Sequence, residues 1–145
     1  MSATATTTTP AARSLGPALV AGVGLLLAMD IAGALISLSA GLNPTLLDAL
    51  GSQARLSAPI PMMIAQVVLV IGATRRHRGV AIPASALLFV AGALAFMSGF
   101  YDGGYSADLT AGQRVFQIAL VTAHLGVGVL AAVHAVRLLR RRCDS

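Results

Sequence analysis

Charged residues are scarce in this sequence. Only 10% of the 145 residues are charged, whereas 57% are hydrophobic and the mean hydropathy is +0.84. Soluble domains carry about 25% charged residues, and a chain of this length cannot account for the difference with a large core. The surface is therefore expected to face lipid, and the length fits one domain.

Lysine, glutamate and tryptophan are absent, and cysteine occurs once, as Cys143. A single cysteine excludes an intrachain disulfide and any metal site built from several cysteines. All basic residues are arginines and the net charge is +5, but the arginines lie at the ends of apolar segments and no aromatic or motif pattern accompanies them. Nucleic acid is therefore excluded as a partner.

Four apolar segments predict transmembrane helices, at residues 17–39, 57–74, 80–100 and 113–137. A membrane-spanning helix needs about 17 to 25 apolar residues. The second segment is the shortest, although Pro59 and Pro61 suit the first turn of a helix. The first is longer than the core of a cleaved signal peptide, which has about 7 to 15 residues, so we expect it to remain in the mature protein. Short connections favour an all-α integral membrane protein with four transmembrane helices in an antiparallel up-down bundle.

The arginines predict an orientation. Four spans place eight arginines on one side of the membrane and two, Arg55 and Arg114, on the other. Cytoplasmic loops collect arginine, so both termini are expected in the cytoplasm and the protein in the inner (plasma) membrane. Seven of the eight are expected to contact anionic lipid headgroups: Arg75, Arg76, Arg78, Arg137, Arg140, Arg141 and Arg142.

The ends and outer loops have their own signals. Residues 1–14 are rich in Thr and Ala and are predicted to be a disordered cytoplasmic tail, before a transmembrane domain at 15–138 and a basic cytoplasmic tail at 139–145. In the first outer loop, Asn43 is expected to cap a short helix on the membrane surface that begins at Pro44. In the second, Thr110 and Gln113 predict a capping box that opens the last span.

Asp30, Gln66 and His124 are strongly polar residues inside three different spans. Counting about 1.5 Å per residue puts Asp30 and His124 about 13 to 15 Å from the outer ends of their spans, and Gln66 at a similar depth. The spacing i, i+3, i+4, i+7 places Asp30 on one helix face with Gly33, Ala34 and Ser37. A second stripe, made of Gln117, His124, Gly128 and Ala131, runs down the last span. Both small and polar faces are expected to pack against protein.

Three interpretations of this polar cluster remain open. Its members hold the helices together by hydrogen bonds, they form a path for a proton or solute because an intramembrane ionisable group is a functional candidate by default, or they do not meet. No haem or metal site is predicted, because His124 and His134 share one helix, His77 lies in a loop, and Asp30 with His124 gives too few ligands.

The sequence contains no phosphate-binding, metalloprotease or serine-hydrolase motif, and no cofactor is predicted. The leading hypothesis is a non-enzymatic accessory or assembly component whose partners are the lipid bilayer and a larger membrane assembly or a second copy of the chain. The alternative is a proton-coupled carrier or solute-binding protein that uses Asp30, Gln66 and His124. The third is a lipid- or quinone-linked membrane enzyme with Asp30 and His124 as acid and base.

Overall fold

The protein is helical in the computed structural model, which describes residues 15–51, 54, 56–101 and 109–143. These described residues form five helices and no strand: α1 (Gly16–Ser39), α2 (Leu46–Ala49), α3 (Ile60–Ala73), α4 (Arg78–Tyr101) and α5 (Ala111–Cys143). The predicted N-terminal tail, 1–14, lies outside the described residues. Part of the predicted C-terminal tail is helical, because α5 continues through the arginines to Cys143.

Three of the described helices are long and apolar enough to cross a membrane: α1, residues Arg78–Ser98 of α4, and residues Ala111–Arg140 of α5. Helix α3 has 14 residues and is about 21 Å long, which is less than the hydrocarbon thickness of about 30 Å. The predicted second span, 57–74, becomes helical only at Ile60, because Pro59 at the N-cap has extended backbone angles (φ −60°, ψ 146°). Ser57 and Ala58, the residues of this predicted span that precede Pro59, are not helical.

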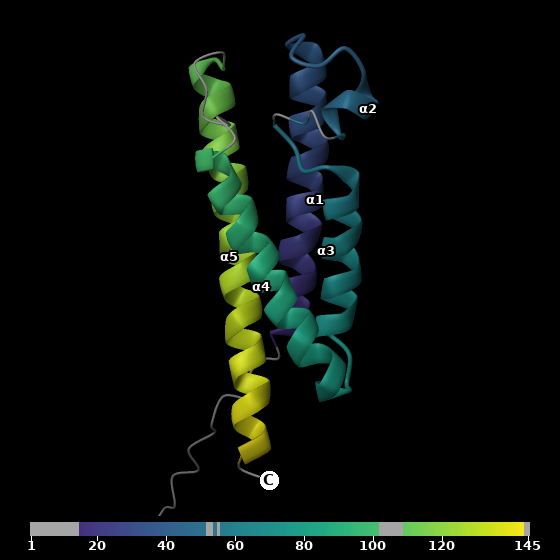
Figure 1. Cartoon of the computed structure of the whole chain (residues 1–145), viewed down its shortest axis with the longest axis vertical. Helices are drawn as coiled ribbons and strands as arrows, with labels where there is room; N and C mark the ends of the chain where they lie inside the picture. Colours follow the sequence, from purple (N-terminus) through teal and green to yellow (C-terminus); the bar gives the residue numbers. More distant parts are fainter. Residues whose placement is uncertain (1–14, 52–53, 55, 102–108, 144–145) are drawn as a thin grey trace, which may run out of the picture.

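The start of α1, the α3–α4 connection and the last turns of α5 lie at one end of the molecule, at the bottom of Figure 1, and α2 lies at the other. We call these the basic end and the α2 end. Helix α4 packs most extensively on α5 and also contacts α3, while α1 contacts both α3 and α5. An apolar core in the half near the basic end joins all four long helices: Leu19, Val23, Val70, Ala73, Ala84, Leu88 and Ala131.

Small residues allow α4 and α5 to approach closely. A Cβ atom on Gly92 of α4 would lie 2.5 Å from the carbonyl oxygen of His124 and 3.2 Å from the Cα atom of Gly128. Small residues are common where membrane helices meet, because packing in lipid depends on close van der Waals contact. The two glycines therefore fix the position of the His124 backbone against α4.

The turn after α1 differs from the sequence prediction. Gly41 has φ +69°, a conformation that favours glycine, and it turns the chain back toward α2. Asn43 is buried and accepts a hydrogen bond from the Ser37 hydroxyl at 2.5 Å. Thr45 caps α2, since its Oγ1 accepts from the Asp48 N–H at 3.2 Å. The prediction that Asn43 caps a helix beginning at Pro44 is therefore wrong, because α2 begins at Leu46 and Thr45 is its N-cap.

The predicted capping box at the start of α5 is confirmed. The Thr110 N–H donates to Gln113 Oε1 at 2.9 Å, and the Gln113 N–H donates to Thr110 Oγ1 at 3.4 Å. Two amide groups at the helix terminus are satisfied in this way. The box determines where α5 begins.

Replacing Thr110 with alanine is expected to destabilise the protein by about 1 kcal/mol, because the helix loses a side-chain cap. The measurement is thermal unfolding of the purified protein in detergent. Thr122→Ala is the matched control, since Thr122 is exposed inside the same helix and alanine is the better helix former there. Equal stability of the two variants would contradict a role for the cap.

Candidate functional site

Asp30 lies on the buried face of α1 and has no exposed surface (0%). One carboxylate oxygen, Oδ1, accepts a hydrogen bond from the backbone N–H of Ala58 at 2.7 Å. The other, Oδ2, is buried and has no hydrogen-bond partner. Gly33, Ala34 and Ser37 on the same face are buried as well. The inward orientation predicted from their spacing is therefore confirmed.

The partner of Asp30 belongs to the non-helical stretch before α3, which we call the extended segment (Leu56–Pro59). Leu56 is fully buried, and a Cβ atom on Gly33 would overlap the Leu56 carbonyl oxygen. Ser57 donates its hydroxyl to the Ala49 carbonyl at 2.5 Å. The extended segment thus lies directly against α1. Asp30 accepts its hydrogen bond there, and the absence of a side chain at Gly33 leaves room for its backbone.

His124 on α5 is also buried, with 4% of its surface exposed. Its Nδ1 lies 2.9 Å from the Leu120 carbonyl oxygen, one turn earlier in the helix. A carbonyl only accepts hydrogen bonds, so Nδ1 carries the hydrogen. The other nitrogen, Nε2, is buried without a hydrogen-bond partner. In the neutral ring Nε2 therefore presents a lone pair to the protein interior.

Gln66 is the buried polar residue of α3, with 2% of its surface exposed. Its Oε1 atom has no hydrogen-bond partner either. Gln117, Gly128 and Ala131, which share the predicted stripe with His124, are all buried. The second stripe predicted from sequence therefore faces protein, as the first does.

The helix contacts give the relative depth of the three polar residues. Gly33 of α1 lies against Phe116 of α5, so Asp30 is level with about residue 119 of α5, and the Cα atom of His124 is about 7 Å closer to the basic end. Gln66 lies in the second turn of α3, which also places it closer to the basic end than the start of that helix. The Cα atoms therefore do not share the single plane that depth counting predicted.

The side chains nevertheless point toward a common level. A Cα–Cβ bond in a helix tilts toward the helix N-terminus. Helix α1 begins at the basic end, while α3 and α5 begin nearer the α2 end (Figure 1). Asp30 therefore leans toward the basic end, and Gln66 and His124 lean toward the α2 end. The side chains of Asp30 and His124 therefore lean toward each other along the bundle axis.

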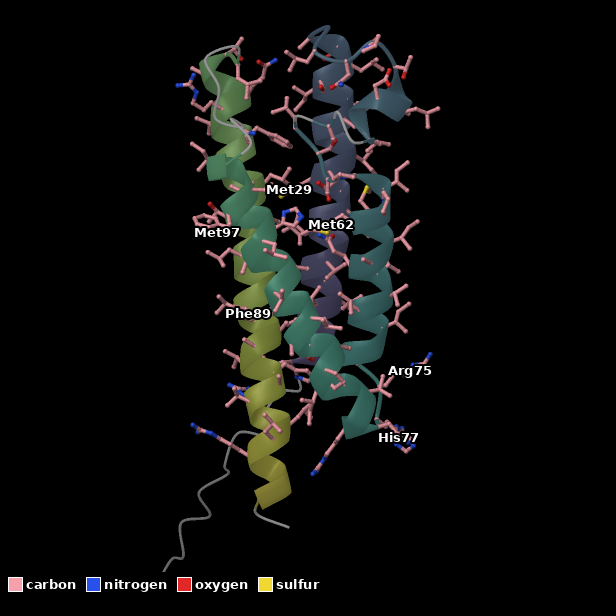
Figure 2. All side chains as sticks on the ribbon, viewed as in Figure 1. Met29, Met62, Arg75, His77, Phe89 and Met97 are labelled. Carbon is pink, nitrogen blue, oxygen red and sulfur yellow. The ribbon has the colours of Figure 1, made fainter. Side chains whose placement is uncertain are left out.

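The predicted headgroup-contacting arginines are solvent- or lipid-accessible where the structure describes their side chains. Arg75, Arg76, Arg78, Arg137 and Arg140 are exposed, and Figure 2 shows Arg75 and His77 at the basic end. The side chains of Arg141 and Arg142 lie outside the described part of the chain. These five arginines thus lie at the end opposite α2.

His134 has a contact that the sequence did not predict. Its Nε2 lies 3.2 Å from the carbonyl oxygen of Ala73, the last residue of α3. Carbonyls in the last turn of a helix have no partner inside the helix, and a histidine can supply one. No local pattern reveals this contact, because 61 positions separate the two residues. His134 fastens α5 to the end of α3.

Within the described residues, no group of three or more His, Cys, Asp or Glu side chains is arranged to hold a metal ion. Comparison of the chain with protein-family models, with curated proteins and with solved structures found no match. The polar cluster of Asp30, Gln66 and His124 is therefore judged on its own chemistry.

Proposed function

We propose that the chain is a multipass protein of the inner (plasma) membrane with four transmembrane helices in an antiparallel bundle. Helices α1, α4 and α5 are the long spans, and α3 together with the extended segment forms the fourth. The basic end faces the cytoplasm, in keeping with the preference of cytoplasmic loops for arginine. Helix α2 lies at the outer interface, where the exposed side chains of Leu46 and Leu47 enter the membrane surface.

The polar cluster of this bundle takes up a proton, and the protein acts as a proton-coupled carrier or solute-binding protein. One observation carries this proposal: Asp30 Oδ2 and His124 Nε2 are buried on facing helices, and neither has a hydrogen-bond partner. Both atoms are acceptors when the groups are unprotonated. Two acceptors cannot hydrogen-bond to each other, so each of these buried atoms needs a donor, and protonation of either group would turn its unpaired atom into a donor.

A role in holding the helices together does not explain why these buried atoms lack hydrogen-bond partners. Buried polar groups that serve packing alone are normally hydrogen-bonded, because an unpaired group costs about 1–3 kcal/mol. Asp30 Oδ1 has this packing role through Ala58, but Oδ2, Gln66 Oε1 and His124 Nε2 do not. Unpaired buried groups are where a ligand that donates hydrogen bonds is expected.

The cluster is closed on both sides. The extended segment covers Asp30 toward the α2 end, and the apolar core that includes Val23, Val70 and Leu88 lies toward the basic end. This arrangement fits an occluded site, which a carrier needs between its two open states. A bundle of only four helices encloses little space, so we expect the carrier to operate as a homodimer.

Proton binding is tested by infrared difference spectroscopy of the purified protein in lipid, recorded between two pH values. The chain has no glutamate and five aspartates, so few carboxyl groups contribute. The wild type is expected to show a carboxylic-acid carbonyl band that Asp30→Asn removes and that His124→Gln shifts in pH. Asp48→Asn is the control, since Asp48 lies on α2. A band that survives unchanged in Asp30→Asn would overturn the proposal.

Transport is tested separately, by the acidification of proteoliposomes under an imposed pH gradient. Loss of acidification in Asp30→Asn, with normal folding, supports the carrier. Proton binding without flux would favour the accessory component that the sequence suggested. Absence of proton binding would mean that the cluster serves only to pack the helices. The enzymatic hypothesis has no supporting contact in the described residues. It would be supported if the purified wild type formed a product and the His124→Ala variant did not.

A further inference from the structure

The extended segment is the part of the chain that separates the polar cluster from the α2 end. Its backbone lies against Gly33, and Leu56 has no exposed surface (0%). Irregular backbone at membrane depth is tolerated only where protein buries it or a water-filled cavity adjoins it. The segment therefore stays in place only while its polar groups have partners.

Three hydrogen bonds join the segment and the first residue of α3 to α1 and to the α2 region. The Ala58 N–H donates to Asp30 at 2.7 Å, the Ser57 hydroxyl donates to Ala49 O at 2.5 Å, and the Ile60 N–H donates to Leu50 O at 2.9 Å. The last two acceptors are backbone carbonyls near α2, and they do not titrate. Only the bond to Asp30 attaches the segment to α1, and only that bond has an ionisable acceptor.

The charged groups around Asp30 are few. Helix α5 contributes His124, and Arg114 lies exposed near the start of the same helix. Helix α2 contributes Asp48, which accepts a hydrogen bond from the Thr45 hydroxyl at 2.6 Å. Helix α3 has no charged side chain. His124 is therefore the only titratable group at the depth of Asp30 among the described residues.

We propose that the extended segment is the outer closure of the polar cluster and that the protonation of Asp30 releases it. This inference rests on the proposed proton-binding function and adds a means of control. With Asp30 ionised, the Ala58 N–H is held by a charge-assisted hydrogen bond. With the proton on the carboxyl group, taken from outer water or from the His124 imidazolium, the bond becomes a neutral one.

The expected effect follows from hydrogen-bond strengths. A hydrogen bond to a charged group is about twice as strong as one between neutral groups. The difference corresponds to about a tenfold increase in the fraction of molecules with the segment released. The two backbone-anchored bonds remain, so the segment moves away from α1 while it stays tied to α2. Asp30 then meets water from the outer side, and its proton exchanges there.

Cysteine labelling tests the closure. The native Cys143 is replaced by serine, Ser57→Cys is introduced into the extended segment, and a membrane-impermeant maleimide is applied from outside to proteoliposomes at several pH values. Ser39→Cys is the matched control, because Ser39 is exposed at the end of α1, and it corrects for the pH dependence of thiol reactivity. The ratio of the Ser57→Cys rate to the control rate is expected to rise about tenfold as the pH falls.

Two further variants distinguish release of the extended segment by protonation of Asp30 from a general loss of packing at low pH. In Asp30→Asn the amide oxygen still accepts from Ala58 but does not titrate, so the ratio is expected to be independent of pH. In Gly33→Ala the added methyl group overlaps the Leu56 carbonyl oxygen, so labelling is expected to be fast at every pH. A flat ratio in the wild type, or a pH-dependent ratio retained in Asp30→Asn, would overturn the closure.

The outcomes also distinguish this inference from the proposed function. A flat labelling ratio in a protein whose Asp30 still shows its infrared band removes the closure and leaves proton binding intact. Absence of the infrared band removes the proposed function, and with it the reason for a pH-dependent ratio. A ratio that changes with pH while proteoliposomes show no flux supports the closure as a proton-controlled device without transport.

Discussion

Replacing Gly92 with alanine is expected to separate α4 from α5 and to lower the thermal stability of the detergent-solubilised protein by several degrees. The new Cβ atom would lie 2.5 Å from the His124 carbonyl oxygen and 3.2 Å from the Gly128 Cα atom. Both neighbours are backbone atoms, so neither can rotate away as a side chain does. Overpacking of this kind costs about 1–3 kcal/mol.

The matched control is Gly126→Ala on α5. A Cβ atom at Gly126 meets nothing within 4 Å, so alanine there should leave the stability unchanged or raise it by up to about 1 kcal/mol through helix propensity. The two variants make the same chemical change in helices that contact each other. If both behaved alike in thermal unfolding, close packing at Gly92 would not hold the helices together.

The Gly92 variant also tests how the polar cluster is supported. The His124 backbone is in contact with α4 at Gly92, and the unpaired Nε2 of the His124 side chain is buried. A shift of α5 would change the distance between this nitrogen and Asp30. The infrared band of Asp30 is therefore expected to move in Gly92→Ala and to stay in place in Gly126→Ala.

Features that depend on helical periodicity could be predicted from the sequence. The faces that contain Asp30 and His124 recur at i, i+3, i+4 and i+7, and a residue four positions away lies on the same side of any helix. The capping box of Thr110 and Gln113 is equally local, because both partners lie within one turn. Such predictions need no knowledge of which helices are neighbours.

The partner of Asp30 could not be predicted in this way. Ala58 lies 28 positions away, in a stretch whose apolar composition suggested the start of a span. Hydrophobicity shows that a segment avoids water, but it does not show whether the backbone is helical. Pro59 and Pro61 suit the first turn of a helix by sequence, whereas Pro59 has the extended conformation of an N-cap in the structure. In the sequence, only the short length of this apolar segment indicated that part of the second span is not helical.

The structure therefore gives the two carboxylate oxygens of Asp30 environments that the sequence did not predict. The sequence leaves three interpretations open for Asp30 with Gln66 and His124: hydrogen bonds that hold the helices together, a path for a proton or solute, or no contact at all. In the fold its two oxygens have different roles, since Oδ1 holds the extended segment and Oδ2 remains unpaired toward the interior. A single side chain thus contacts both the extended segment and the buried site that we propose to bind a proton.

Replacing Asp30 with leucine is expected to destabilise the protein strongly, whereas Asp30→Asn is expected to be close to wild type. Leucine has no acceptor for the Ala58 N–H, and an unpaired buried amide costs about 1–3 kcal/mol. Its branched side chain must also fit beside the extended segment at a position with no exposed surface (0%). Asparagine has nearly the same shape and keeps an oxygen at the position of Oδ1.

The measurement is the unfolding midpoint of both variants in the same detergent, at a pH where wild-type Asp30 is ionised. Both substitutions remove the charge, but only leucine removes the acceptor and changes the shape of the side chain. Relief of a buried charge, which favours both variants equally, therefore cancels in the difference between them. An Asp30→Leu protein as stable as Asp30→Asn would mean that the Ala58 bond does not hold the extended segment. The proposed closure would then lack the hydrogen bond that keeps it in place.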